Sequence, residues 1–434
     1  MKPEPDPAAP PSPTPTAGPI RAVPAGWTFA ALVAGFGLGL TLSRLAPNLL
    51  ASLLLVAGPI GDLWLRALQS TIVPLVAALL FTGIVQTAAA ARAGTLARRA
   101  LLFFFAILGA GTAFSALVVP LILRAVPIPA AAADALRASA GGTAAPVPAI
   151  GDYLRSLIPS NVLAAAATDA MLPMIVFVAA LAVATTRLPG RQREALAGVF
   201  EALGSALLVV IGWILAIAPL GVFALSLAVV ARSGVGAVGA LVHYVLTVAS
   251  IGACVLLAAP VVALAFARIG PARYLAAVTP ALGVALSTQS SLASLPAMID
   301  SCRRLGVRQT TADLVLPLAV ALFRATSPAM NLAVAIYVAR WYGLALTPGV
   351  LLAGFAVAMV TTIGSVSLPG SISFVSAIGP IALAMGVPVA PLALLVAVEV
   401  LPDLVRTVGN VAMDVAVTAA VDRVRMHGPD QADA

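Results

Sequence analysis

Residues 391–421 read PLALLVAVEVLPDLVRTVGNVAMDVAVTAAV, and this stretch decides the fold. It is apolar and long enough to cross a bilayer as a helix, yet five polar residues interrupt it: Glu399, Asp403, Arg406, Asn410 and Asp414. Because each residue of an α-helix turns by about 100°, their spacing of 4, 3, 4 and 4 places them within roughly 80° of one face. Ionisable groups at membrane depth are costly, so such a stripe normally lines a substrate or ion path. The stretch therefore predicts a protein that moves a solute across a membrane.

The composition of the whole chain is typical of a polytopic membrane protein. Of 434 residues, 61% are hydrophobic and only 9% are charged, whereas soluble domains contain about 25% charged residues. The net charge of +8 comes from basic residues scattered between apolar segments, without interleaved aromatic residues. This distribution argues against a nucleic-acid-binding surface and follows the positive-inside rule instead.

Eight apolar segments are predicted to be transmembrane helices. They cover about residues 26–44, 57–90, 97–124, 171–187, 197–231, 235–267, 310–340 and 390–421. Residues 1–24 are rich in proline and lack the apolar core of a signal peptide, so we expect a disordered cytoplasmic tail.

Arginines set the expected orientation of these spans. One side of the predicted membrane receives Arg92, Arg98, Arg99, Arg187, Arg191, Arg193, Arg268, Arg273, Arg303, Arg304, Arg308, Arg423 and Arg425. The other side receives fewer, so the asymmetry predicts a cell (inner) membrane protein with both termini in the cytoplasm.

Two segments, residues 274–302 and 350–387, are predicted to enter the membrane and turn back. The first has arginines on the same side before and after it, and its middle reads STQSSLASLP. The second has IGSVSLPGS at its centre and no charge between Arg340 and Glu399. Broken helices at membrane depth are tolerated where they line a cavity, and in transporters their free backbone groups meet substrates and ions. A Ser/Gly-rich packing face between helices is the alternative interpretation of each segment.

Several stretches together resemble one known family, the dicarboxylate/amino acid:cation symporters, which include glutamate and aspartate transporters. The most specific is DLVRTVGNVAMD at 403–414, which is similar to the family pattern D-x-x-R-T-x-x-N-x-x-x-D. STQSSLASLP and IGSVSLPGS resemble the two hairpin tips of the family, and APLGVFAL at 218–225 resembles an internal family stretch. The resemblance covers about residues 26–425.

The resemblance implies an all-α polytopic membrane protein with eight transmembrane helices and two re-entrant hairpins. It also implies a lipid-embedded homotrimer in which a transport domain slides against a fixed scaffold, as an elevator. Residues 25–96 and 125–231 would form the scaffold. Residues 97–124 and 232–425 would form the transport domain, with hairpins at 274–305 and 348–387 and a tail at 426–434.

The resemblance also implies a substrate site. Arg406 would bind a substrate side-chain carboxylate through a bidentate pair, and Asp403 would accept the substrate ammonium. The other implied substrate-binding residues are Ser290, Ser291, Ser327, Ser365, Pro369, Gly370, Thr407 and Asn410, of which Ser365 to Gly370 would form the gate. The implied function is symport of a small anionic or zwitterionic substrate: an acidic amino acid such as aspartate or glutamate, or a related dicarboxylate. Asp403 favours the amino acid.

The chain departs from the family in the sodium-binding region. FRATS at 323–327 replaces Asn-Met-Asp-Gly-Thr, so Phe323 and Ala325 stand where the family has an ion-binding Asn and Asp. Three further ligand positions, on the third span, are occupied by Phe104, Ile107 and Leu108. A hard cation needs several oxygen ligands, so we expect this sodium site to be absent. A residual site at Asn410 and Asp414 is the one remaining metal candidate.

Arg324 brings a permanent positive charge into the same region, because a guanidinium does not lose its proton in proteins. The hypothesis is that it stands in for a bound sodium ion and interacts with Asp414 or the substrate. Sodium coupling would then be reduced, or replaced by protons through Asp414 or Glu399, or by exchange. The alternative is a structural role without effect on transport. No cofactor is expected apart from the coupling cation, H⁺ or Na⁺.

An intramembrane enzyme is the first rival interpretation. Asp403 and Asp414 are 11 residues apart, about 16 Å along a helix, too far to share a proton as a catalytic dyad does. No HExxH or GxSxG motif is present, so the chain is not expected to be an enzyme. A channel, or an uncoupled exchanger of small organic anions on the same fold, remains the alternative.

Two other polar features are expected to be structural. Asp62 and Arg66 have the i,i+4 spacing of a helical salt bridge. His243 is a lone histidine on an apolar helix and is interpreted as a hydrogen-bonded core residue.

Overall fold

A computed structural model of the chain describes residues 25–92, 94–128, 158–168, 171–233, 236–364 and 370–426. Within these ranges all regular secondary structure is helical. Seven of the described helical stretches are long and apolar enough to cross a membrane. The predicted all-α, polytopic membrane fold is therefore confirmed, while the two predicted tails lie outside the described residues except for Met426.

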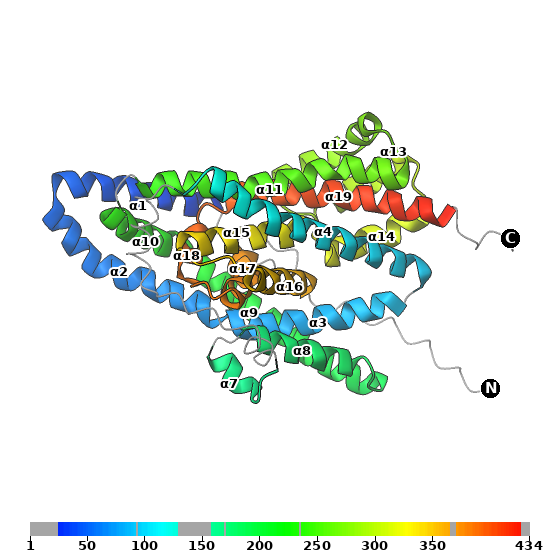
Figure 1. The fold of residues 1–434 in the computed structure, drawn as a ribbon, viewed down its shortest axis with the longest axis horizontal. Helices are drawn as coiled ribbons and strands as arrows, with labels where there is room; N and C mark the ends of the chain where they lie inside the picture. Colours follow the sequence, from blue (N-terminus) through cyan, green and yellow to red (C-terminus); the bar gives the residue numbers. More distant parts are fainter. Residues whose placement is uncertain are drawn as a thin grey trace, which may run out of the picture.

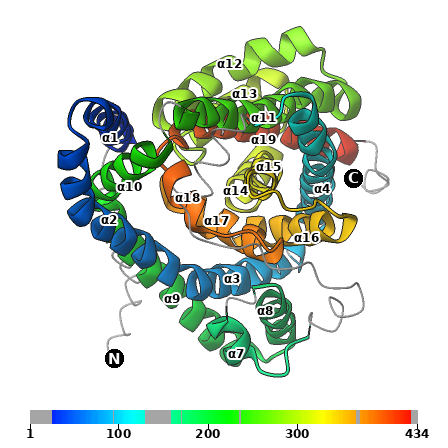
Figure 2. The same ribbon diagram turned by 60° about the vertical axis from the view of Figure 1, so that its left-hand side comes forward.

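One group of helices lies along one side of the molecule (Figures 1 and 2). It contains α1 (Ala25–Leu45), α2 (Pro47–Ser70), α3 (Ile72–Arg92), α7 (Val162–Ala167), α8 (Met171–Thr185), α9 (Gly190–Ala216) and α10 (Ala218–Ser233). Helices α1 and α2 both pack against α10, and α3 packs against α8 and α9. The Trp64 indole of α2 donates to the carbonyl of Ile214 in α9 at 3.0 Å. These contacts make the group one packed body.

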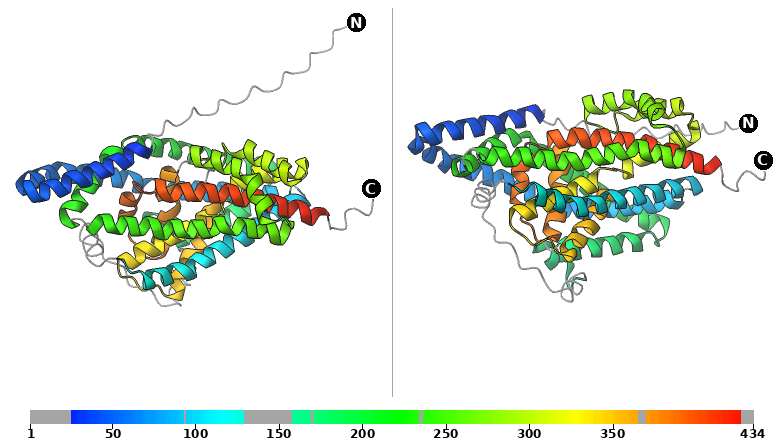
Figure 3. Two further views of the ribbon diagram at one scale, coloured as in Figure 1. Left: turned by 90° about the horizontal axis from the view of Figure 1, so that it is seen from above. Right: turned by 45° about the horizontal axis from the view of Figure 1, so that its top comes forward.

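The remaining helices form a second body. They are α4 (Thr95–Ala125), α11 (Gly236–Ala267), α12 (Pro271–Thr288), α13 (Leu295–Leu305), α14 (Gln309–Leu322), α15 (Ser327–Trp341), α16 (Pro348–Gly364), α17 (Gly370–Ala384), α18 (Ala390–Leu395) and α19 (Val400–Met426). Helices α4, α11 and α19 run side by side (Figure 3). Helix α15 lies in the middle of this body (Figure 2), and all of its residues except Arg340 are buried. It therefore contacts protein on every side.

Both predicted hairpins are pairs of neighbouring helices. Helix α12 ends at Thr288. The next residue, Gln289, has a left-handed φ of 51°, and α13 returns alongside α12. The Tyr274 hydroxyl of α12 donates to the carbonyl of Ala412, which fastens this hairpin to α19. Helices α16 and α17 form the second pair. Their connection, residues 365–369, lies outside the described residues.

Four predicted spans are divided between two helices rather than continuous. The span at 57–90 falls on α2 and α3, and the span at 197–231 falls on α9 and α10. The span at 310–340 divides into α14 and α15, because Phe323 leaves helical geometry and Pro328 starts a new helix in its first turn. The span at 390–421 divides into α18 and α19. Pro402 cannot donate to the carbonyl four residues earlier, which disfavours one uninterrupted helix there.

Two smaller predictions need correction. The predicted span at 171–187 is the 15-residue helix α8, whose apolar part, Pro173–Thr185, is shorter than the seven long spans. Asp62 and Arg66 form no ion pair within the described structure, and both are exposed on α2. The expected salt bridge between them is wrong, because the i,i+4 spacing brings two long side chains near each other without fixing their rotamers.

Candidate functional site

The polar stripe of α19 is buried inside the second body. Its five members, Glu399, Asp403, Arg406, Asn410 and Asp414, are each at most 5% exposed. Glu399 comes one residue before the first residue of α19, and its carbonyl accepts from the Asp403 backbone N–H at 2.8 Å. Charged groups in such surroundings need polar partners, and the packing of α19 supplies them from two other helices.

The guanidinium of Arg406 is the centre of the site. Its Nη2 donates to Glu399 Oε1 at 2.5 Å, and its Nε lies 3.3 Å from Asp403 Oδ1. From α15, the Asn331 side-chain oxygen accepts from Nη1 at 2.7 Å. All three nitrogens of the guanidinium therefore have a polar partner within the protein, two through hydrogen bonds and one through an ion pair.

Glu399 is held from a second direction by α11. The Tyr244 hydroxyl donates to Glu399 Oε2 at 3.2 Å, and Tyr244 is fully buried. Tyr244 packs edge-on against Tyr337 of α15. The two oxygens of Glu399 thus contact different partners, Arg406 on one side and Tyr244 on the other.

His243, the neighbour of Tyr244, connects three helices. Its Nδ1 lies 3.0 Å from the Tyr337 hydroxyl, and its Nε2 lies 3.0 Å from the carbonyl of Val126, just after α4. Both ring nitrogens are hydrogen-bonded, as expected for a structural histidine.

The break between α14 and α15 faces the middle of the stripe. The Asn410 side-chain oxygen accepts from the Thr326 backbone N–H at 2.9 Å and lies 2.8 Å from the Thr326 hydroxyl. The same hydroxyl lies 3.0 Å from the carbonyl of Arg406. Gly409 permits this close approach, because a Cβ there would lie 2.6 Å from Thr326 Cγ2. The broken helix is therefore fixed against the polar stripe of α19.

Two buried polar groups near the break have no hydrogen-bond partner among the described residues. They are the Ser327 hydroxyl and both carboxylate oxygens of Asp414. Arg324, in the break itself, lies close enough to Asp414, Asp403 and Arg406 for its charge to act on all three. Unsatisfied buried polar groups are rare in folded proteins, so this region is a candidate contact surface for a substrate or a coupling ion.

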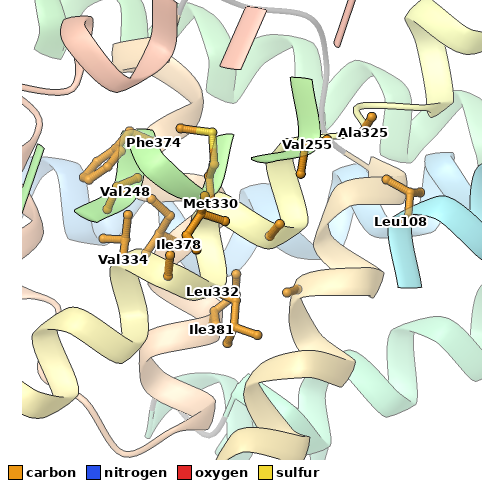
Figure 4. Close-up of a cluster of buried hydrophobic side chains, with 14 of the residues drawn as sticks. Leu108, Val248, Val255, Ala325, Met330, Leu332, Val334, Phe374, Ile378 and Ile381 are labelled. Carbon is orange, nitrogen blue, oxygen red and sulfur yellow. The ribbon is translucent and has the colours of Figure 1, made fainter. Parts of the chain in front are cut away.

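Apolar side chains fill the region where the sequence predicts the loss of a sodium site. The rings of Phe104 and Phe323 stack with centroids 4.5 Å apart and an angle of 9° between their planes. Leu108 and Ala325 are buried in the hydrophobic cluster shown in Figure 4, which also contains Val255. None of these five side chains has an oxygen atom that could bind a hard cation.

The other predicted site residues belong to the two hairpins or to α19. Ser290 and Ser291 are half-buried at the tip of the first hairpin. The Ser290 hydroxyl accepts from the backbone N–H of Ala293 at 3.2 Å, within its own turn. Thr407 is buried on α19, next to Arg406. Ser365 and Pro369 lie outside the described residues, and Gly370 is the first residue of α17.

Sequence reasoning missed three site residues: Tyr244, Thr326 and Asn331. Asn331 had a usable signal, since an amide side chain inside an apolar span is costly unless it is hydrogen-bonded. Tyr244 and Thr326 had none, because neither residue type is unusual in a membrane helix or at a helix break.

The family of the chain follows from its match to a family model. Residues 25–424 match the sodium:dicarboxylate symporter family. The chain belongs to this family. Members of the sodium:dicarboxylate symporter family are secondary transporters, so the buried stripe belongs to a multi-pass transport protein.

Curated relatives in this family have different substrates in their names. The chain is 27% identical to the proton/glutamate-aspartate symporter of Escherichia coli (strain K12), over 81% of this chain and 82% of the relative. It is 29% identical to the neutral amino acid transporter B(0) of Oryctolagus cuniculus, over 89% of this chain and 77% of the relative. It is 25% identical to C4-dicarboxylate transport protein 3 of Ralstonia nicotianae, over 92% of this chain and 91% of the relative. The substrate of this sodium:dicarboxylate symporter family member therefore has to be argued from its own site.

Proposed function

We propose that this protein is a symporter of an acidic amino acid, such as aspartate or glutamate, or of a related dicarboxylate. The observation that carries the proposal is the buried guanidinium of Arg406, on the polar stripe of α19. The backbone carbonyl of the same residue accepts from the Thr326 hydroxyl in the break between α14 and α15. A buried guanidinium is the best side chain for binding a carboxylate through two parallel hydrogen bonds. Arg406 would bind the side-chain carboxylate of the substrate.

Asp403 favours an amino acid over a plain dicarboxylate. Its carboxylate is buried one turn before Arg406, 3.3 Å from the guanidinium. A substrate ammonium would give this carboxylate an opposite charge, whereas a dicarboxylate would add a like charge beside it. The buried Ser327 hydroxyl and Thr407 are further groups available to the substrate.

The coupling ion is proposed to be the proton, with sodium coupling reduced or lost. The stacked rings of Phe104 and Phe323 support this, because neither side chain has an oxygen atom that could bind sodium. Arg324 supports it too, because its charge acts on Asp414 as a bound cation's would. In this proposal Arg324 takes the place of a sodium ion that relatives with an intact site would bind.

Transport is proposed to follow an elevator mechanism in a homotrimer within the lipid of the cell membrane. The two bodies of the fold are offset along the long axis, with the ends of α1 and α2 extending past α15 and α18 (Figure 1). The hairpin helices α16 and α17 pack against α3 of the other body, so this contact would be the sliding interface. Both termini would lie in the cytoplasm, and the protein would catalyse no covalent chemistry.

A proteoliposome uptake screen tests the proposal. Purified protein is reconstituted, and uptake of labelled aspartate, glutamate, succinate and a neutral amino acid is measured in sodium-free buffer, with and without an inward proton gradient. We expect proton-stimulated uptake of aspartate or glutamate without sodium. A strict requirement for sodium would overturn the coupling proposal, and uptake of neutral amino acids alone would overturn the substrate proposal.

Arg406→Ala provides the matching variant. It is expected to abolish uptake of acidic substrates, because it removes the buried guanidinium that would bind the substrate carboxylate. Arg304→Ala is the control, since Arg304 is an exposed arginine that pairs with Asp300 on α13. Unchanged aspartate uptake by Arg406→Ala would contradict the assignment.

A further inference from the structure

The site already contains an anion that competes with the substrate for Arg406. A guanidinium has five N–H donors, and here Nη2 contacts Glu399, Nη1 contacts Asn331 and Nε contacts Asp403. A substrate carboxylate that forms two parallel hydrogen bonds needs a pair of these donors. Two of the three contacts are to carboxylates, and the shorter of these, to Glu399, uses the same chemistry as a substrate carboxylate would.

Glu399 has charged or polar neighbours on two helices, α19 and α11. Arg406 and Asp403 face it from α19, and Tyr244 faces it from α11. Asn331, from α15, contacts the same guanidinium but is uncharged. Tyr244 can donate to either form of the Glu399 carboxyl group, so this hydrogen bond can persist when the contact with Arg406 is lost.

A substrate carboxylate cannot simply join Glu399 at Arg406. Three carboxylates would then surround one guanidinium in a site where Glu399 and Arg406 are almost fully buried, and like charges at such distances disfavour ionisation. An ionised Glu399 displaced from Arg406 would be a buried carboxylate without its charge partner, which is strongly unfavourable. If Glu399 takes up a proton, the crowding of like charges at Arg406 is relieved, and Glu399 is no longer a buried charge without a partner.

We infer that Glu399 is the proton carrier of this transporter, resting on the proposed function above. In the empty site the ionised carboxylate of Glu399 occupies Arg406. When an acidic substrate binds, Glu399 takes one proton and becomes neutral, its contact with Nη2 breaks, and the substrate carboxylate takes its place. When the substrate leaves on the other side, Glu399 releases the proton and binds Arg406 again.

This exchange keeps the buried charge constant. Glu399, Asp403 and Arg406 together leave the empty site with one negative charge. An acidic amino acid brings one net negative charge, and the proton on Glu399 cancels it. The empty and the loaded site therefore carry the same charge, so neither form crosses the membrane at a greater cost than the other. Transport of one amino acid with one proton is electroneutral, and uptake will not respond to membrane potential.

Asp414 does not fit the same role. It lies 11 residues after Asp403, about 16 Å along the helix, and Arg324 rather than Arg406 is the charge that acts on it. Protonation of Asp414 would leave the contact between Glu399 and Arg406 in place. The proton that opens the substrate position therefore belongs on Glu399.

The first experiment uses Glu399→Gln in proteoliposomes. The variant lacks the titratable group, so a proton gradient will no longer drive aspartate accumulation, while exchange of internal for external labelled aspartate will continue and will show that the protein is folded. Asp300→Asn, at an exposed carboxylate of α13, is the control and will keep gradient-driven accumulation. Accumulation by Glu399→Gln that still follows the proton gradient would overturn the inference.

The second experiment needs no variant. Aspartate is added to purified protein in weakly buffered detergent solution near neutral pH, with a pH indicator present. We expect the solution to become more alkaline in proportion to the bound aspartate, because the protein takes up protons on binding. Aspartate binding without any pH change would overturn the inference even if Glu399→Gln fails to fold. A wild-type protein that neither binds nor transports acidic amino acids would instead overturn the proposed function.

Discussion

Asn410 of α19 and Thr326 of the break between α14 and α15 are joined by two contacts of 2.9 and 2.8 Å, both to the Asn410 side-chain oxygen. The first satisfies a backbone N–H that the break removes from helical hydrogen bonding. Because a buried backbone donor needs a partner, the broken helix depends on α19 for its stability. The polar stripe and the break therefore form one rigid unit.

Replacing Asn410 with Ala tests this dependence. The change leaves the N–H and the hydroxyl of Thr326 without their shared acceptor, so we expect a loss of about 1–3 kcal/mol in the free energy of unfolding. Thermal unfolding in detergent measures it. Asn48→Ala, at an exposed residue of α2, is the control and should leave the transition unchanged. Equal melting temperatures for Asn410→Ala and wild type would show that the break holds its shape without α19.

Gly409→Ala tests the close approach at the same place. The added Cβ would lie 2.6 Å from Thr326 Cγ2, so the break must move away from α19. Overpacking of this kind typically costs 1–3 kcal/mol, and we expect a lower melting temperature and weaker substrate binding. The double variant Gly409→Ala with Thr326→Ser lacks the clashing methyl group. It should recover part of the melting temperature and part of the substrate affinity.

Gly198→Ala gives the matched control for Gly409→Ala. Gly198 lies within helix α9, and nothing approaches the position of its Cβ within 4 Å. Alanine there should be neutral or stabilising by up to about 1 kcal/mol, because glycine is a poor helix former. If Gly409→Ala were equally harmless, the packing of the break against α19 would be looser than the structure shows.

The sequence predicts which site residues share one face of α19 better than it predicts which residues of other helices contact them. Helical periodicity alone places Glu399, Asp403 and Arg406 on one face, and their cost in an apolar span predicts burial against protein. The contacts from Tyr244 and Asn331 depend on how α11 and α15 pack, which no local pattern specifies. The break at Phe323 had a local signal in Pro328, but proline also occurs inside other helices of this chain, such as Pro120 of α4.

Asn331→Ala tests the support of Arg406 from α15. The change removes the acceptor 2.7 Å from Nη1 and leaves a buried, charged donor unpaired, at a cost of about 1–3 kcal/mol. Arg406 would then be less well oriented for a carboxylate, so we expect affinity for aspartate to fall on the order of tenfold. Binding calorimetry measures this. Asn331→Gln, which keeps an amide oxygen, should lose less affinity; an equal loss in both variants would point to packing rather than the hydrogen bond.

Arg324→Met tests whether a fixed charge replaces a bound cation. Without Arg324, the buried carboxylate of Asp414 loses a cation whose charge acts on it, so we expect lower thermal stability and loss of uptake. Added sodium should not restore uptake, because Phe104 and Phe323 fill the neighbouring space. The double change Arg324→Met with Asp414→Asn removes both charges together and should recover stability.

The control for Arg324→Met is Arg340→Met, at the exposed arginine of α15. It removes an arginine side chain in the last turn of α15, away from Asp414, and should leave uptake and stability near wild type. The recovery in the double variant decides the interpretation, because a purely steric role for Arg324 would leave the double variant as unstable as Arg324→Met alone. Sodium-stimulated uptake in Arg324→Met would mean instead that an ion can still reach Asp414, and that the guanidinium excludes it by occupying its place.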